Sequence, residues 1–152
     1  MKYEISNNIK NNDYQKLYDD YFPEKAQIMK SFISNNKINY FIHAKENDKI
    51  IGSMGIDNFD DDCYMFSNLV VNENYTGQGV ATGIIRMAVK FLIDLGAKKI
   101  VNHKRENIIP HTTFTDMGFK LVKYSEEIPE YKWNYELNTK EAINMWTQYK
   151  GI

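Results

Sequence analysis

The chain has 152 residues and a formal net charge of −1, so it is long enough to bury the core of one domain. A nearly neutral chain whose only arginines are Arg86 and Arg105 lacks the basic field that attracts nucleic acid or anionic lipid, and both partner classes are excluded. The single cysteine, Cys63, excludes an internal disulfide; with no apolar leader after Met1 and no membrane-length apolar run, we expect a soluble cytoplasmic protein.

The N-terminal part of the chain is predicted to hold one strand and two helices. Residues 2–5 are predicted to form a short strand, and the amphipathic stretches 11–21 and 24–33 are predicted helices that Pro23 separates. The core-facing side chains expected in these helices are Leu17, Tyr21, Ile28, Phe32 and Ile33.

Three further strands are predicted before the middle of the chain, joined by polar turns. The strands are expected at 38–44, 49–56 and 63–71, with turns at 46–48 and 57–62. Because these turns are too short to hold a crossover helix, the strands are expected to pair as antiparallel hairpins.

A long helix is predicted from Val80, and Gly96 is placed to end it. Its apolar residues recur every three or four positions and predict one buried stripe, formed by Ala81, Ile84, Ile85, Ala88, Leu92 and Leu95. A strand, a short helix, two late strands and a terminal helix are then expected at 99–102, 107–117, 119–124, 131–137 and 139–149. In the last of these strands the residues that share one face are Tyr131, Trp133, Tyr135 and Leu137.

The predicted order of elements is β-α-α-β-β-β-α-β-α-β-β, which is a mixed α/β fold. The long helix requires a crossover to a parallel neighbouring strand, whereas the strands before it are antiparallel. No repeat, low-complexity tract or linker interrupts the sequence, so residues 1–152 are expected to form a single domain.

The most informative segment is the glycine-containing turn between the strand at 63–71 and the long helix. It follows the apolar residues Leu69, Val70 and Val71 and comprises Thr76, Gly77, Gln78, Gly79, Val80, Ala81 and Thr82. A helix N-terminus leaves backbone N–H groups unpaired and carries a partial positive charge, and glycines let a ligand approach the backbone closely. The turn therefore predicts a phosphate-binding cradle.

Two nucleotide-binding patterns fit this turn less well. The P-loop pattern requires a Gly-Lys-Ser/Thr ending, which the turn lacks. The dinucleotide pattern Gly-x-Gly-x-x-Gly begins at Gly77 and Gly79, but Thr82 occupies the third glycine position and Gly83 comes one residue late. A nucleotide-binding protein is kept only as the weaker hypothesis.

The turn and a second element resemble the GCN5-related N-acetyltransferase (GNAT) superfamily. The acyl-CoA signature of that superfamily, Gln/Arg-x-x-Gly-x-Gly/Ala, falls on residues 76–81, with Thr76 departing from the Gln/Arg position. The second element is a strand, an asparagine and a short helix that ends in Gly-Phe. Its matches here are Ile100-Val101, Asn107, Pro110, Phe114 and Gly118-Phe119.

The resemblance implies the GNAT fold, a mixed and mostly antiparallel sheet flanked by helices, in which the parallel strands 63–71 and 99–102 splay apart around the cofactor. Acetyl-CoA would be the co-substrate, and no metal is implied. Its pyrophosphate would bind the amides of residues 78–82, and its pantetheine would pair with the backbone of residues 69–71. By the same resemblance, Asn107 would hydrogen-bond the pantetheine and Phe114 would contact the cofactor.

The reaction implied is direct transfer of the acetyl group to a primary amine in a ternary complex. Because a primary amine is protonated at neutral pH, a general base is expected, and the candidates are Glu73, His103 and His111. Many family members protonate the leaving thiolate with a tyrosine, where this chain has Phe114; Thr113 or Tyr124 are candidate replacements. Cys63 is expected to be structural, because no Cys/His/Asn group surrounds it in the sequence.

The acceptor is expected to be a small-molecule, peptide or lysine amine, and a cationic one would suit the acids beside aromatic residues. The residues that the resemblance places at the acceptor site are Asp19, Asp20, Tyr21, Phe22, Glu126, Glu127 and Glu130. An alternative is an acyl-CoA-binding or sensor module without efficient chemistry, which Thr76 and Phe114 keep open. The late aromatic strand and Trp146 leave a monomer and a homodimer both open.

Overall fold

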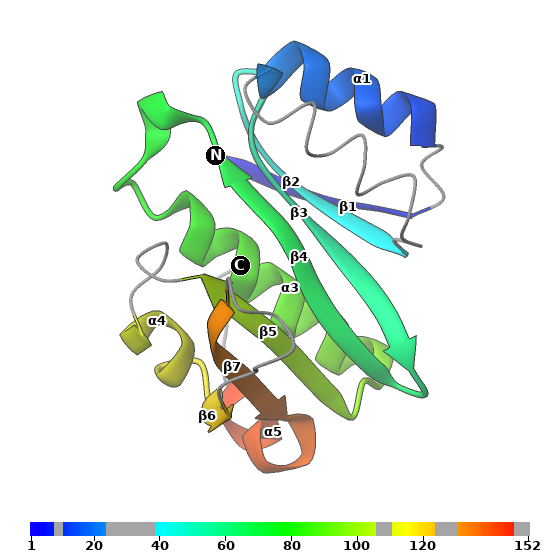
Figure 1. Ribbon diagram of the computed structural model, residues 1–152, viewed down its shortest axis with the longest axis vertical. Coiled ribbons are helices and arrows are strands. Elements are labelled where there is room, and N and C mark those ends of the chain that lie inside the picture. Colours follow the sequence, from blue (N-terminus) through cyan, green and yellow to red (C-terminus); the bar gives the residue numbers. More distant parts are fainter. Residues whose placement is uncertain (8–10, 24–38, 106–110, 124–130, 148–152) are drawn as a thin grey trace. The chain divides into compact units, whose positions relative to one another are not determined.

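The computed structural model describes residues 1–7, 11–23, 39–105, 111–123 and 131–147 (Figure 1). These residues fall into two compact units. Unit 1 comprises Met1–Asp57 and Ser67–Ile85, and unit 2 comprises Asn58–Phe66 and Arg86–Ile152. The prediction of a single domain stays a prediction.

The helices and strands follow the expected order. Unit 1 holds β1 (Lys2–Asn7), α1 (Asn11–Tyr21), β2 (Tyr40–Glu46), most of β3 (Lys49–Asp60), the end of β4 (Cys63–Val71), the 3-10 helix η1 (Glu73–Tyr75) and the start of α3 (Val80–Leu95). Unit 2 holds the end of β3, the start of β4, the rest of α3, β5 (Lys99–Arg105), α4 (His111–Thr115), β6 (Lys120–Lys123), β7 (Tyr131–Asn138) and α5 (Thr139–Thr147). Hydrogen bonding orders the seven described strands β1-β2-β3-β4-β5-β7-β6, so the mixed α/β fold is confirmed.

Unit 1 is built on antiparallel strands with helices on both faces. β1 pairs with β2 from Lys2↔Lys45 to Asn7↔Tyr40, and β2 pairs with β3 across a turn. Gly52 of β3 lies under α3, because a Cβ there would come within 2.8 Å of Ile84 Cδ1. Ser53 is instead a hydrogen-bond partner of Tyr18 in α1. Since neighbouring strand residues point to opposite faces, α1 and α3 cover opposite faces of these strands.

Gly83 shows why a glycine stands one position later than the dinucleotide pattern requires. A Cβ at Gly83 would collide with the hydroxyl group of Tyr3 in β1. The glycine therefore allows α3 to approach β1 closely. It serves helix-to-sheet packing, which gives the glycine a role that involves no ligand.

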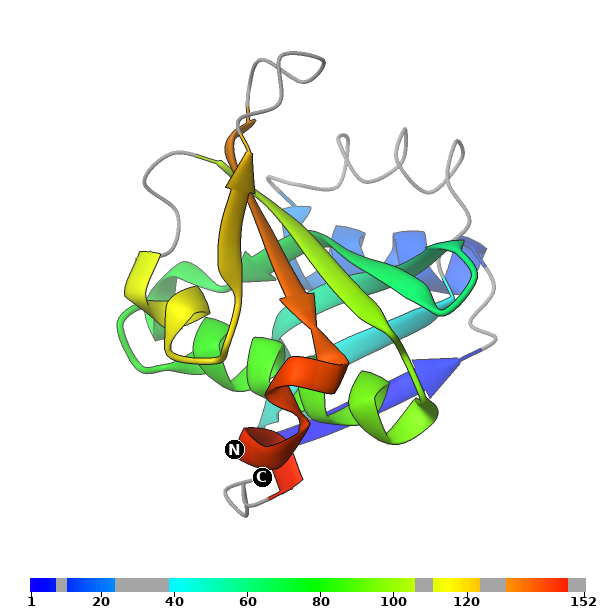
Figure 2. The same cartoon turned by 90° about the horizontal axis from the view of Figure 1, so that it is seen from below.

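Unit 2 contains both parallel and antiparallel strand pairings (Figure 2). The first four residues of β4, Cys63–Phe66, pair in parallel with Lys99–Asn102 of β5, which confirms the predicted crossover. β5 then pairs antiparallel with β7, and β7 with β6. Trp146 of α5 donates its indole N–H to the carbonyl of Met117 at 2.9 Å, which fixes the terminal helix to the segment after α4.

Several element boundaries differ from the prediction. The predicted helix 11–21 is confirmed, while the predicted helix 24–33 lies outside the described residues. β3 continues to Asp60 because backbone pairing extends through exposed residues that have no apolar pattern. β5 continues to Arg105, beyond the predicted end at 102.

The buried stripe of α3 is confirmed along its middle, but the predicted first residue, Ala81, is only half-buried. Ile84, Ile85, Ala88 and Leu92 are fully buried, and Gly96 ends the helix with φ 97°. Leu95 was predicted to be buried but is 47% exposed, because it is the last residue of the helix and the periodicity does not show where the packing surface stops. Among the described residues, no helix is long and apolar enough to cross a membrane.

Candidate active site

Asn72 organises the turn that follows β4. Its backbone N–H donates to the carbonyl of Ile51 in β3 at 2.7 Å, which holds the end of β4 against the sheet of unit 1. Its side-chain Oδ1 accepts from the N–H of Asn74 at 2.9 Å, and its carbonyl accepts from the N–H of Tyr75 at 2.9 Å. These bonds cap η1 and fix where the turn leaves the strand.

Thr76, the residue that departs from the family signature, is part of the turn itself. Its hydroxyl donates to the carbonyl of Glu73 at 2.9 Å. Two residues later, Gln78 Nε2 donates to the carbonyl of Asn74 at 3.4 Å. Thr76 thus holds the turn by a local bond.

Gly77 and Gly79 give the turn its shape. Their φ angles are 76° and 81°, which L-residues other than glycine rarely adopt. No described atom lies within 4 Å of the position that a Cβ would take at either residue. The backbone is therefore open to approach on this side of the turn.

The first turn of α3 presents backbone donors. Gly83 donates its N–H to the carbonyl of Gly79 at 2.9 Å, which is the first α-helical hydrogen bond. The amides of Val80, Ala81 and Thr82 precede it and have no carbonyl within the helix to bind. The first turn contains no acidic side chain. A 16-residue helix with such a start favours an anion at its N-terminus.

The end of β4 contains an irregularity just before the predicted pantetheine-binding residues. Asn68 has φ 51°, in the left-handed region. The neighbouring Ser67 Oγ is buried and has no hydrogen-bond partner among the described residues. Leu69 and Val71 are half-buried, and Val70 is 8% exposed. Unit 1 thus brings the predicted residues Leu69–Val71 and Thr76–Thr82 together on consecutive elements.

The proposed bases differ in their surroundings. Glu73 is exposed and begins η1, directly after Asn72. His103 was expected to follow its strand but lies within β5, opposite Asn134 of β7, because the strand is longer than predicted. His111 is the first residue of α4.

Asn107 and Tyr124 lie outside the described residues, as do the predicted acceptor-site acids 126, 127 and 130.

Two further predictions concern α1 and Cys63. Asp19 and Asp20 are exposed and Tyr21 is half-buried, as an acceptor-facing segment allows. Phe22 was also predicted to border the acceptor, but it is 0% exposed, and its ring packs in a tilted arrangement with its centroid 5.5 Å from that of Tyr18, so the ring is part of the core. Cys63 is half-buried in β4, opposite Lys99 of β5.

Phe114 lies in an aromatic cluster of unit 2. Its ring is fully buried, and its centroid is 4.7 Å from that of Tyr135 and 5.6 Å from that of Phe119. Tyr135 lies on the predicted shared face of its strand and is fully buried there. Burial raises the pKa of Tyr135. The signal that was missed is the pairing of β6 and β7 behind α4, which the alternation pattern alone does not reveal.

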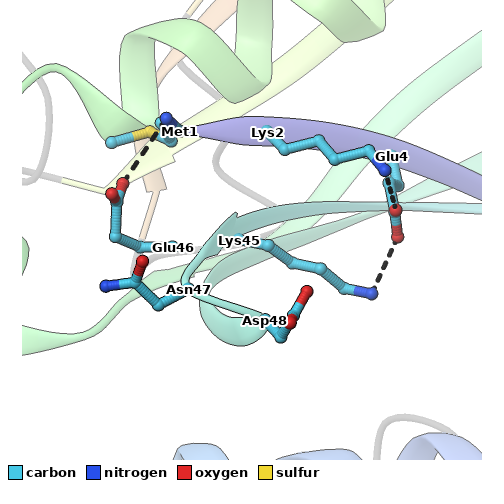
Figure 3. Close-up of a pocket in the computed structure, with 7 residues that line it drawn as sticks. All are labelled: Met1, Lys2, Glu4, Lys45, Glu46, Asn47 and Asp48. Carbon is cyan, nitrogen blue, oxygen red and sulfur yellow. Dashed lines mark ion pairs between the residues drawn. The ribbon is translucent and has the colours of Figure 1, made fainter.

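The structure also has an open hollow of about 320 Å³ at the β2–β3 turn (Figure 3). Its lining is strongly charged: Met1, Lys2, Glu4, Lys45, Glu46, Asn47 and Asp48. Lys45 and Lys2 pair with Glu4 at 2.8 and 3.3 Å, and these hydrogen bonds lower the pKa of Glu4. None of the predicted site residues lines this hollow. No group of three or more potential metal ligands occurs in the part of the chain that the structure describes.

Comparison with known proteins points to one family. The model of the acetyltransferase (GNAT) family matches residues 4–119. The ribosomal-protein-S18-alanine N-acetyltransferase of Escherichia coli superposes with a TM-score of 0.68 at 18% identity, over 90% of this chain and 94% of that one. The PaiA N-acetyltransferase of Thermoplasma acidophilum, solved in complex with coenzyme A, has a TM-score of 0.62 at 16% identity, over 91% and 99%. A GNAT acetyltransferase of Staphylococcus aureus gives 0.65 at 13% identity, over 90% and 99%. No curated protein sequence matches significantly.

Proposed function

This chain belongs to the GNAT acetyltransferase family, and we propose that it transfers an acetyl group from acetyl-CoA to a primary amine by direct attack in a ternary complex. The observation that carries the proposal is the start of α3. There, two glycines with positive φ lead into three backbone amides that have no partner within the helix.

The pyrophosphate of acetyl-CoA is the group that this start fits. The amides of Val80, Ala81 and Thr82 point their donors out of the helix, and the helix dipole adds a partial positive charge. A substrate anion gains from both, and the acid-free first turn does not repel it. Gly77 and Gly79 keep side chains away from the approach to the backbone.

The pantetheine and thioester follow along the end of β4 in this proposal. The backbone of Leu69, Val70 and Val71 would bond the pantetheine amides as an added strand does, and Asn107 would bind the same arm. A backbone N–H near Val71 would polarise the thioester carbonyl. Such a donor stabilises the charge that develops on oxygen as the amine attacks.

Glu73 is the preferred base of this reaction, and His103 is the second candidate. Glu73 is exposed and close in sequence to Val71, where it can take a proton from an amine directly or through water. For the departing thiolate, we add Tyr135, which stacks on Phe114, to the candidates Thr113 and Tyr124. A tyrosine phenol is protonated at neutral pH, which is the state that a proton donor needs.

Ligand-dependent thermal unfolding tests the proposal. A ligand that binds only the folded protein at 100 times its dissociation constant adds about 2.7 kcal/mol of stability. We expect acetyl-CoA and CoA to raise the unfolding midpoint, and ATP and NAD to leave it unchanged. The absence of a shift with acetyl-CoA and CoA would refute the proposal, and a shift with ATP or NAD alone would favour a nucleotide-binding protein.

The second candidate function is an acyl-CoA-binding or sensor module. Phe114 favours it, because a buried phenylalanine replaces the tyrosine by which many family members protonate the leaving group. Thiol release from acetyl-CoA over a broad panel of amines separates the two functions. Binding of CoA without thiol release from any amine would establish the module and exclude the enzyme. Cytoplasmic localisation stays a prediction.

A further inference from the structure

A row of polar side chains crosses the strands of unit 1 on the face that α1 covers. Glu4 of β1 lies directly opposite His43 of β2, and His43 lies directly opposite Ser53 of β3. Residues that are directly opposite in antiparallel strands place their side chains on the same face. His43 is 4% exposed and Ser53 is 0% exposed, so the inner part of this row is buried.

Tyr18 of α1 continues this row towards β4. It is 1% exposed, its hydroxyl is a hydrogen-bond partner of Ser53, and it donates to the carbonyl of Asn68 over a long distance of 3.5 Å. Burial raises the pKa of Tyr18 to about 12, although the bond from Ser53 acts in the opposite direction. The phenol therefore stays protonated at neutral pH, and the carbonyl of Asn68 is an acceptor for its proton.

Asn68 is the residue at which β4 leaves regular strand geometry. Its φ of 51° is costly for most L-residues and is tolerated best by asparagine and aspartate. The parallel register of β4 covers Cys63–Phe66, and the residues assigned to pantetheine, Leu69–Val71, follow Asn68 at once. The orientation of the Asn68 peptide group thus sets the direction of the amides that come next.

We propose that Tyr18 is a positioning residue of the acetyl-CoA site: its hydroxyl, oriented by Ser53, holds the carbonyl of Asn68 and so fixes the left-handed turn that aims the backbone of Leu69–Val71. This inference rests on the proposed function, because it assigns a role in presenting the β4 backbone to acetyl-CoA.

Packing alone does not account for a tyrosine at this position. The ring of Tyr18 packs against Phe22 at 5.5 Å, and a phenylalanine would fill the same space. A buried hydroxyl is unfavourable unless it is hydrogen-bonded, and the hydroxyl of Tyr18 has hydrogen-bond partners on β3 and β4. The hydroxyl therefore links α1 to two strands at the one left-handed residue within β4.

The test compares Tyr18→Phe with Tyr40→Phe, which removes a phenol hydroxyl from a half-buried position in β2. CoA dissociation constants are measured by calorimetry at a temperature where both variants are fully folded. We expect Tyr18→Phe to weaken CoA binding by about five-fold, the scale of one hydrogen bond, and Tyr40→Phe to leave it unchanged. Equal CoA affinity in wild type and Tyr18→Phe would overturn the inference while leaving the proposed function intact.

A second comparison, made in the Asn68→Gly variant, separates a positioning role of the Tyr18 hydroxyl from a general effect on stability. Glycine adopts positive φ without strain, so a glycine at position 68 no longer needs the bond from the Tyr18 hydroxyl to hold this conformation. Tyr18→Phe should then cost little CoA affinity in the Asn68→Gly background, whereas a packing role predicts the same loss in both backgrounds. If Tyr18→Phe does not fold, Ser53→Ala removes the bond that orients the Tyr18 hydroxyl, and unchanged CoA affinity in Ser53→Ala would overturn the inference. A wild-type protein that binds no CoA would instead refute the proposed function itself.

Discussion

The two units of this protein bury different kinds of side chain. Unit 1 buries polar groups, with His43 and Ser53 beneath α1 and Tyr18 bonded to Ser53. Unit 2 buries an aromatic cluster in which Phe114 stacks on Tyr135.

The donors proposed to bind cofactor in unit 1 are backbone amides, which need glycines and hydrogen bonds to hold their direction. In unit 2 the groups proposed to protonate the leaving thiolate are side-chain hydroxyls. Backbone sites are encoded by local sequence, whereas a side-chain site depends on which residues the fold brings together.

The largest effect is expected where the backbone of unit 1 is blocked. Gly79→Trp places a bulky side chain at the turn before α3, and we expect CoA affinity to fall roughly a thousand-fold, or about 4 kcal/mol. Gly96→Trp is the matched control, because Gly96 also has positive φ and no described atom near its Cβ position, at the other end of α3. Calorimetric titration checks both variants. Equal loss in the two variants would show that backbone strain, and not the cradle, controls binding.

A smaller effect is expected on the free energy of unfolding when the pH is lowered, because unit 1 buries a histidine. Burial, aided by Lys45 and opposed by Glu4, lowers the pKa of His43 to about 4 from its ordinary 6.5. The folded state thus favours neutral His43. Its contribution is complete above pH 6.5 and is lost as the pH falls towards 4. The full shift corresponds to about 3 kcal/mol, of which about 2 kcal/mol is lost between pH 7 and pH 5.

Urea unfolding at pH 7 and pH 5 measures this loss of unfolding free energy. We expect His43→Gln to lose less stability than wild type over the same interval, because glutamine does not titrate. An identical loss in His43→Gln and wild type would assign the acid sensitivity to other groups. The substitution also changes packing, but it does so equally at both pH values. The difference between wild type and His43→Gln in the unfolding free energy lost from pH 7 to pH 5 therefore reports the titration of His43 alone.

The smallest of the three effects is expected from the aromatic interior of unit 2. Tyr135→Phe removes the phenol beside Phe114 and keeps the stacked ring. We expect kcat to fall about ten-fold, since a thiolate with a pKa near 8.5 leaves with limited help from an acid. CoA affinity should not change. Tyr64→Phe in β4 of the same unit is the control, and steady-state thiol release with matched CoA titrations checks both. Unchanged kcat in Tyr135→Phe would remove Tyr135 from the proposed mechanism.

Most of what the sequence predicted correctly is local. The α1 boundaries, the β4 span and the glycine turn before α3 follow from side-chain periodicity, polar turns and glycine, which act over a few residues. The errors occur where no local signal exists. β3 continues through the exposed residues 58–60, and Leu95 lies on the apolar stripe but at the exposed end of its helix.

The family resemblance, the order of elements and the glycine turn before α3 follow from local sequence, because glycines and helix starts specify backbone conformation directly. Tertiary structure alone decided which polar and aromatic side chains meet. Tyr18 in α1 reaches Asn68 in β4 across fifty positions, and Tyr135 in β7 stacks on Phe114 in α4. Such contacts depend on strand order and register, which bring together residues whose distance along the chain carries no record of their proximity.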